Sequence, residues 1–252
     1  MAIWLGLLMV LASALAEPIG APATEIKLIS TIGVRSAVEE LAPQFESKTG
    51  HKVAITFGVA NVLKRQIEAG EAFDLAIMTA AVADDLIKQG RLVAATRTDV
   101  ARGGIGIAVR AGAPKPDIGT VEALKRALLA APSITYAKEG GSGIYFAGLL
   151  ERLGIAEAMR PKTKFGAGNV AELVAAGEAD MAVQLITELM SVRGVQLVGP
   201  LPAEAQNYIV LTAGVGAQAK EPALARELLN FLTAPATGNV YRSKGLEPGP
   251  TF

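Results

Sequence analysis

The sequence contains no cysteine and a single histidine, His51, in 252 residues. Without cysteine there is no disulfide, no thiolate nucleophile and no zinc–thiolate centre, and one histidine cannot build a multi-histidine metal cluster. We therefore expect neither a metal nor a cofactor. An excess charge of one sign is also missing, because Lys+Arg and Asp+Glu both number 24. No basic face is implied for nucleic acid, so a charged ligand has to be held locally.

A hydrophobic run long enough to cross a membrane is missing as well. The apolar stretch from Ile3 to Leu15 is too short for a stable transmembrane helix and is followed by Ala16, which completes the small-x-small pattern of a signal-peptidase site. We predict a signal peptide over residues 1–16 and an exported, periplasmic chain that begins at Glu17. The alternative, a buried N-terminal helix, would leave its apolar surface unpaired ahead of a proline-rich connection.

Short β-branched runs alternate with amphipathic helical patterns from Glu25 onward, which indicates parallel sheets covered by helices. The first unit has a strand over 26–29 and a helix over 34–48 whose apolar residues share one face. Gly50 is a natural C-terminal cap for this helix. Further strands are expected at 52–57, 75–78, 134–137, 163–165 and 181–184, each with a helix after it.

Two segments are interpreted as passages between domains: the glycine-spaced strand Gly103 to Val109, and the strand at 209–212. We therefore predict an α/β fold of two Rossmann-like lobes joined by two crossover strands. Lobe 1 would comprise residues 25–104 and 206–252, and lobe 2 residues 105–205. Two connections make a hinge, and the cleft between hinged lobes is the expected ligand site.

Four strand-to-helix turns are rich in small and polar residues: 30–33, 58–61, 140–143 and 166–169. Each should aim free backbone N–H groups and the positive end of a helix dipole at the carboxyl edge of its sheet. One such turn is typical of any α/β protein, but two from each lobe facing across a cleft predict an anion site. The donors that these turns supply are Ser30, Thr31, Asn61, Ser142, Gly143 and Asn169.

Arg35 is the candidate cation for this site. It lies in the first turn of the helix after Gly33, where the helix dipole disfavours a positive charge. A ligand carboxylate is one reason to keep it there, and a solvated surface position is the alternative. His51, in a loop after Gly50, needs no function.

Three motifs carry a resemblance to a known family. They are Ala-Val-Glu-Glu-Leu-Ala-Pro-Gln-Phe-Glu at 37–46, Arg-Gln-Ile-Glu-Ala-Gly at 65–70 leading to Phe-Asp-Leu at 73–75, and Ser-Gly-Ile-Tyr at 142–145. In order and spacing they resemble the molybdate-binding receptors of ABC importers, a branch of the two-lobed, type II periplasmic binding proteins. The resemblance extends over most of residues 26–245.

The resemblance also implies site residues. Family members hold molybdate or tungstate with two serine hydroxyls from the first lobe, backbone N–H groups from the second, and often a tyrosine hydroxyl. In this sequence the serine positions fall on Gly33 and Ala60, and the backbone positions on Ser142 and Val170. The tyrosine position falls near Leu185, which has no hydroxyl. Gln184, which precedes it, is therefore included among the ligand-binding candidates.

The function that the resemblance implies is that of an extracytoplasmic, monomeric receptor that closes on a small anionic solute and docks on an ABC permease. A molybdate-like oxyanion is the first ligand expected. The missing hydroxyls, together with Arg35, leave a small organic acid as the alternative. An enzyme is not expected, because no nucleophile–base pair or paired carboxylates stand at the turns. A transcription regulator would need a DNA-binding unit ahead of residue 25.

Overall fold

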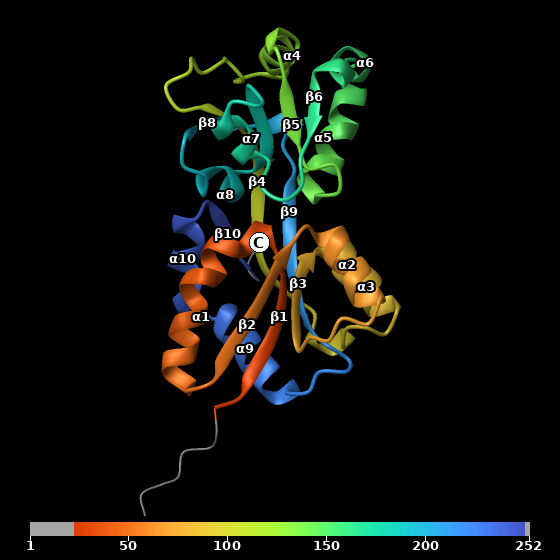
Figure 1. The fold of residues 1–252 in the computed structure, drawn as a ribbon, viewed down its shortest axis with the longest axis vertical. Helices are drawn as coiled ribbons and strands as arrows, with labels where there is room; N and C mark the ends of the chain where they lie inside the picture. Colours follow the sequence, from red (N-terminus) through yellow and green to blue (C-terminus); the bar gives the residue numbers. More distant parts are fainter. Residues whose placement is uncertain (1–22, 250–252) are drawn as a thin grey trace, which may run out of the picture.

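The computed structural model describes residues 23–249, which form two α/β lobes, one above the other in Figure 1. The predicted signal peptide and its cleavage site lie outside the described residues. Within residues 23–249, no helix has the length and apolar character needed to cross a membrane.

Lobe 1 is built on three strands, β1 to β3, with β1 parallel to both of its neighbours. Helices follow these strands, and the C-terminal segment adds two more helices and an edge strand. The elements are β1 (Glu25–Thr31), α1 (Arg35–Thr49), β2 (Lys52–Gly58), α2 (Ala60–Glu68), β3 (Leu75–Thr79), α3 (Ala80–Lys88), α9 (Pro222–Leu232), α10 (Gly238–Ser243) and β10 (Leu246–Pro248).

Lobe 2 repeats the plan around β5, which lies between β6 and β7 and is parallel to both. Three of its helices have six residues or fewer, and one strand, β8, returns antiparallel to β4. The elements are α4 (Val121–Ala130), β5 (Ile134–Tyr136), α5 (Gly141–Arg152), α6 (Ala156–Met159), β6 (Thr163–Phe165), α7 (Ala171–Ala176), β7 (Met181–Leu185), α8 (Ile186–Met190) and β8 (Val195–Pro200).

Two strands connect the lobes: β4 (Thr98–Arg110) and β9 (Tyr208–Val215). Along β4 the antiparallel partner changes from β9, opposite Gly104, to β7, opposite Ile105. At this point the side chain of Gln206 takes the place of a strand neighbour. Its Oε1 accepts from the Ile105 N–H and its Nε2 donates to the Ile105 carbonyl, both at 2.9 Å.

Each lobe buries apolar side chains on both faces of its sheet, as the alternation of the strands requires. On β3, Leu75 and Ile77 pack with α1 and α9, whereas Ala76 and Met78 pack with α2 and α3. In lobe 2, α4, α5 and α6 cover one face and α7 and α8 the other. Helices on both faces place the strand ends, and the turns that follow them, at the cleft between the lobes.

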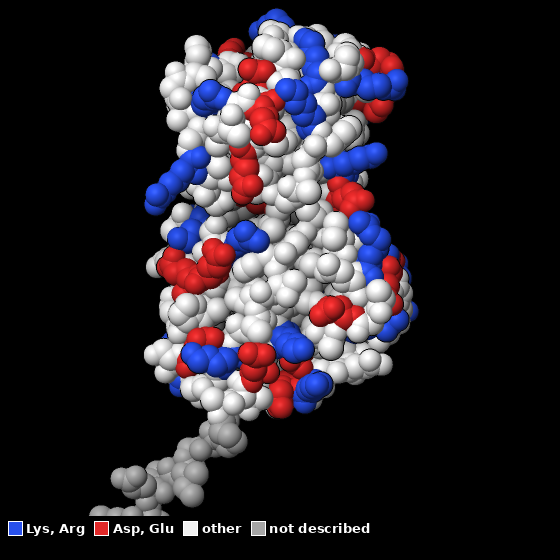
Figure 2. Space-filling model, viewed as in Figure 1, with Lys and Arg blue, Asp and Glu red and all other residues white. Residues whose placement is uncertain are grey.

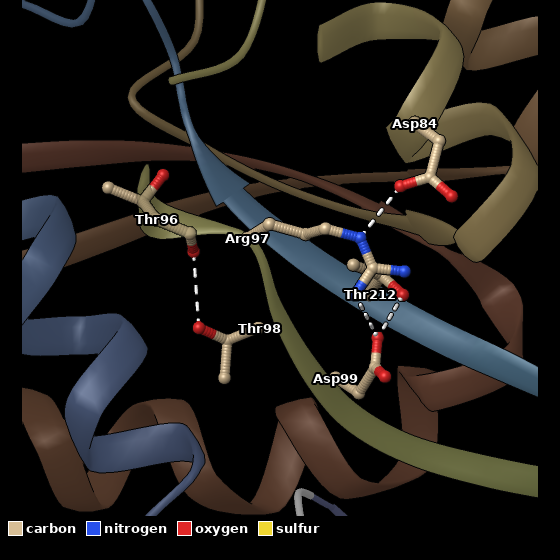
Figure 3. Close-up of polar contacts among 6 residues, drawn as sticks. All are labelled: Asp84, Thr96, Arg97, Thr98, Asp99 and Thr212. Atoms are coloured by element: carbon tan, nitrogen blue, oxygen red, sulfur yellow. Dashed lines mark hydrogen bonds and ion pairs between the residues drawn. The ribbon is translucent and has the colours of Figure 1, made fainter. Parts of the chain in front are cut away.

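A charged cluster fixes the start of β4 in lobe 1 (Figure 3). The Arg97 Nε donates to Asp84 of α3 at 2.7 Å, and its Nη1 donates to Asp99 at 3.1 Å. The Thr212 hydroxyl on β9 donates to the same Asp99 oxygen at 2.6 Å. These contacts tie the two connecting strands and α3 together on the lobe 1 side of the connection between the lobes.

The fold prediction was accurate for the order of elements and less so for helix starts. The turns at 58–61 and 140–143 lie partly inside helices, because α2 begins at Ala60 and α5 at Gly141. Gly50 adopts the left-handed conformation expected of a C-cap, with φ of 74°. Four elements were missed, namely α6, β8, α10 and β10, because short segments without a clear period give little signal.

Asp74 supplies a test of how lobe 1 is held together. Its carboxylate is buried and accepts from three backbone N–H groups, those of Lys27 (2.8 Å), Lys220 (2.7 Å) and Glu221 (3.1 Å). Asp74→Ala leaves these donors unsatisfied, so we expect the free energy of unfolding to fall by about 2–4 kcal/mol in urea titrations. The exposed control Asp117→Ala should change it by less than about 0.5 kcal/mol. An equal effect of both variants would contradict this account.

Candidate functional site

The cleft between the lobes contains a small inner cavity of about 20 Å³ with walls from both lobes. Lobe 1 contributes the end of β1 and the starts of α2 and α3, and lobe 2 contributes the start of α5 and the end of β7. On the face shown in Figure 2 the molecule narrows between the lobes, and uncharged atoms predominate in the middle of that junction. Residues of three of the four turns named from the sequence, 30–33, 58–61 and 140–143, line this cavity, whereas no residue of the fourth turn, 166–169, does.

Three helices begin at the inner cavity. The residues that precede α2, α3 and α5 are Val59, Thr79 and Gly140, and all three line the cavity. None of the three provides a side-chain cap to its helix. The first N–H groups of each helix thus lack both intrahelical and capping partners and leave a partial positive charge at the cavity.

Three hydroxyl groups line the same cavity: those of Thr31, Thr79 and Ser142. Among the described residues, none of these hydroxyls has a hydrogen-bond partner, although Thr31 and Ser142 are only 5% exposed. Unpaired donors at a cavity suit a ligand with acceptor oxygens. The sequence prediction named Thr31 and Ser142 but missed Thr79, which follows β3 at the same sheet edge.

Much of the remaining wall is aliphatic, with Ile32, Leu185, Ile209 and Leu211 in contact with the cavity. A Cβ on Gly33 would lie 3.0 Å from Leu185 Cδ1 and 3.4 Å from Leu211 Cδ2. The position that the resemblance assigns to a serine therefore has little room for a side chain. Gly33 does not line the cavity, and Ala60, the second such position, lines it without a hydroxyl.

The Gln184 side chain is hydrogen-bonded to a backbone N–H group that the resemblance assigns to ligand binding. Its Oε1 accepts from the Val170 N–H at 3.1 Å, and its Nε2 donates to the Gly168 carbonyl at 3.2 Å. Gln184 is buried and lines the inner cavity, whereas Val170 does not. In this arrangement the start of α7 presents its donor to a glutamine and not to the cleft.

Glu188, in the first turn of α8, is the one titratable side chain at the inner cavity. It is buried, and its Oε2 accepts from the Leu185 N–H at 3.3 Å. Burial raises the pKa of Glu188 to about 8, so the carboxyl is mostly neutral at pH 7. The sequence prediction missed this residue because it lies beyond the turns, within an apolar run that carries no motif.

A larger outer chamber of about 440 Å³ also lies between the lobes, and Ile32 lines both spaces. Arg35 faces this chamber, with its guanidinium carbon 4.7 Å from the centre of the Phe57 ring and its Nε 4.0 Å from Glu39. Asn169 lines the chamber too, but its Nδ2 donates to the Glu188 carbonyl at 2.8 Å. Arg35 and Asn169 are thus separated from the donors of the inner cavity.

Two further residues predicted to bind the ligand, Ser30 and Gly143, lie near the inner cavity. The Ser30 hydroxyl is fully buried and donates to the Thr31 carbonyl at 3.2 Å. A Cβ on Gly143 would lie 1.9 Å from the Ala137 carbonyl oxygen, so only glycine fits there. Neither residue lines the inner cavity.

Asn61 and Arg65 of α2 join the lobes on one side of the cleft. Asn61 Nδ2 donates to the Glu139 carbonyl at 2.8 Å, and Arg65 Nη2 lies 2.7 Å from Glu139 Oε2. Glu139 directly precedes Gly140, so these contacts hold the start of α5 next to the start of α2. Within residues 23–249, no three His, Asp or Glu side chains are grouped so that they could hold a metal ion.

The raised pKa of Glu188 predicts a pH-dependent stability. Between its unfolded pKa of 4.5 and its folded pKa of about 8, the folded state binds more protons than the unfolded state. The free energy of unfolding should therefore fall as the pH rises through this range, by about 1.4 kcal/mol per pKa unit at most. Glu188→Gln should lose this component, as urea midpoints at pH 5 and pH 8 would show. Equal pH slopes in both proteins would contradict the prediction.

Residues 26–247 match the family of bacterial extracellular solute-binding proteins. The chain is 30% identical over 236 residues to a Pseudomonas protein named aconitate isomerase, covering 91% of this chain and 90% of that one. It is 28% identical over 240 residues to the molybdate-binding protein ModA of Azotobacter vinelandii, covering 89% and 90%.

The solved structure of the periplasmic molybdate-binding protein of Azotobacter vinelandii has the same fold. It superposes with a TM-score of 0.77 at 19% identity, covering 89% of this chain and all of the other. This likeness confirms the predicted two-lobed, type II periplasmic-binding-protein fold and the resemblance to molybdate-binding receptors. By its sequence match over residues 26–247, the chain belongs to the bacterial extracellular solute-binding proteins, and it is a solute-binding protein of the ABC-transporter type.

Proposed function

We propose that this protein is a periplasmic receptor for a small organic acid, whose carboxylate is held in the inner cavity. The observation that carries the proposal is the composition of the cavity wall. Unpaired hydroxyls and three helix N-termini supply donors for a carboxylate, and the aliphatic side chains beside them supply contacts for a carbon skeleton. A bare tetrahedral oxyanion makes no use of such an aliphatic wall.

The changes at the expected molybdate ligands support the same choice. Gly33 and Ala60 offer no hydroxyl, and the Val170 N–H is bonded to Gln184. An anion that depended on these three donors would lose hydrogen bonds worth about 1.5–3 kcal/mol each. We therefore propose the organic acid ahead of molybdate or tungstate, reversing the order that the sequence alone favoured.

The volumes of the inner cavity and the outer chamber indicate how large a ligand the cleft can hold. The inner cavity has room for one functional group, while the outer chamber beyond Ile32 is much larger. A di- or tricarboxylate can place one carboxylate at the helix N-termini and extend past Ile32. Arg35, whose Nη atoms have no partner among the described residues, then lies on the side where a second carboxylate would emerge.

Aconitate, an unsaturated tricarboxylate, is the first acid to test, because the relative at 30% identity is named for it. In the receptor role the lobes close on the acid, and the closed monomer docks on a membrane permease. A second candidate function is isomerisation of the bound acid. Glu188 favours it, because a buried carboxyl at the ligand cavity is a group that can move a proton.

Calorimetric titration tests the proposed ligand class. We expect tight binding of di- and tricarboxylates, aconitate included, and weaker binding of molybdate, tungstate and sulfate. Ser142→Ala removes a donor to a charged group and should weaken carboxylate binding by about 10- to 100-fold. Arg35→Ala should weaken di- and tricarboxylates by about two- to fivefold and leave monocarboxylates unchanged.

The control is Ser243→Ala, an exposed serine in α10 that should not change any affinity. Molybdate binding that exceeds all carboxylates and survives Arg35→Ala would overturn the organic-acid proposal in favour of the oxyanion. Tight binding of a neutral or cationic solute instead would contradict the anion site itself.

A further inference from the structure

We propose that Glu188 is a catalytic residue that carries a proton between two carbon atoms of an unsaturated acid bound in the closed cleft. The inference rests on the proposed function, because it requires the acid to lie in the inner cavity. It assigns to this chain a proton-transfer activity in addition to binding.

The position of Glu188 is the first argument. It is the one group at the inner cavity that can gain or lose a proton near neutral pH, since every other lining residue is aliphatic, a glycine, a hydroxyl or the amide of Gln184. The hydrogen bond from the Leu185 N–H holds its Oε2. The Gln184 side chain, which also lines the cavity, forms a second hydrogen bond to this carboxyl group, so both contacts hold it at the cavity wall.

The surroundings of Glu188 suit a general base. The aliphatic residues that line the cavity with Glu188 disfavour the ionised form of its carboxyl group, and burial raises the pKa of Glu188 to about 8. A carboxylate with a pKa near the working pH is a much stronger base than one with the ordinary value and is still ionised in part of the molecules. A purely structural role, the capping of α8, accounts for the hydrogen bond between Glu188 Oε2 and the Leu185 N–H. That role does not require the Glu188 side chain to border a ligand cavity.

The step is balanced without a cofactor. Ionised Glu188 takes a proton from the methylene carbon next to the double bond, so a C–H bond breaks and an O–H bond forms. The electron pair spreads over the three-carbon allyl unit and its carboxylate, which allows rotation about the former double bond. The carboxyl proton of Glu188 exchanges with solvent, and Glu188 then delivers a proton to the far carbon, the double bond shifts, and Glu188 is ionised again.

The donors of the cavity stabilise the charge that develops in this step. Negative charge moves from carbon onto the carboxylate oxygens as the proton leaves. The hydroxyls of Thr31, Thr79 and Ser142 and the N-termini of α2, α3 and α5 are fixed donors at the cavity. Donors that are already oriented strengthen their bonds to the carboxylate as its charge rises, and so lower the barrier.

The experiment is proton exchange in heavy water. Full-length protein is incubated with cis- or trans-aconitate in D2O, and proton NMR follows loss of the methylene signal and the appearance of the other isomer. We expect the wild type to catalyse exchange above the protein-free rate. Glu188→Gln should slow it by about 100-fold or more, whereas aconitate affinity, measured by calorimetry, changes by less than about threefold.

Two further variants complete the design. Glu188→Asp keeps the carboxyl group but withdraws it by one methylene, so exchange should be slowed less than in the glutamine variant. Glu227→Gln, on the exposed face of α9, is the matched control and should change neither exchange nor binding.

The outcomes separate binding from proton transfer. Aconitate binding without exchange in the wild type, or exchange undiminished in a folded Glu188→Gln protein, overturns the role of Glu188 and leaves the receptor function intact. Failure of the wild type to bind aconitate or any other carboxylate overturns the proposed function, and the inference falls with it.

Discussion

The cleft depends on one constraint, which is that α2, α3 and α5 all begin at the same place without a capping side chain. Parallel strands bring the starts of their following helices to one sheet edge, and residues at these edges of both lobes line the same cavity. The closely packed glycines before and within α5 admit this approach, since a Cβ on Gly141 would lie 3.1 Å from Thr79 Cγ2. We therefore propose that one small anion between the lobes binds the uncapped donors of both.

Around this shared electrostatic framework, the side chains determine which anion fits. In this chain Leu185 and Leu211 fill the space beside Gly33, and Gln184 caps the backbone at Val170. The cavity loses side-chain and backbone donors but gains an aliphatic wall and a buried acid, Glu188. The proposal of a carboxylic acid as ligand rests on this combination of donors for its oxygens and aliphatic contacts for its carbons.

Much of this arrangement could be predicted from the sequence. The alternation of strands and helices gave the two lobes, and the glycine- and serine-rich turns located Thr31, Ala60 and Ser142 at the cavity. Thr79 was within reach of the same reasoning, because it also follows a parallel strand. Thr79 was missed because a single threonine at the end of an apolar strand is common and does not by itself indicate a ligand site.

Other features depend on tertiary contacts that no local pattern encodes. Asn61 looked like a ligand donor, yet it bonds to the Glu139 carbonyl 78 residues away in the other lobe. Gln184 looked like a ligand contact and also bonds within lobe 2. Glu188 is buried because α8 packs against β4 and against residues 32–34 of lobe 1. The position of Glu188 in the sequence does not reveal these contacts.

The central claim is that the closed cleft selects a small organic acid. Native mass spectrometry of the protein purified from its own host tests it most directly, with mild release and identification of any co-purified small molecule. The account predicts one bound di- or tricarboxylate per monomer, retained by the wild type and lost in Ser142→Ala. A bound molybdate or tungstate, or a neutral or cationic solute, would contradict it.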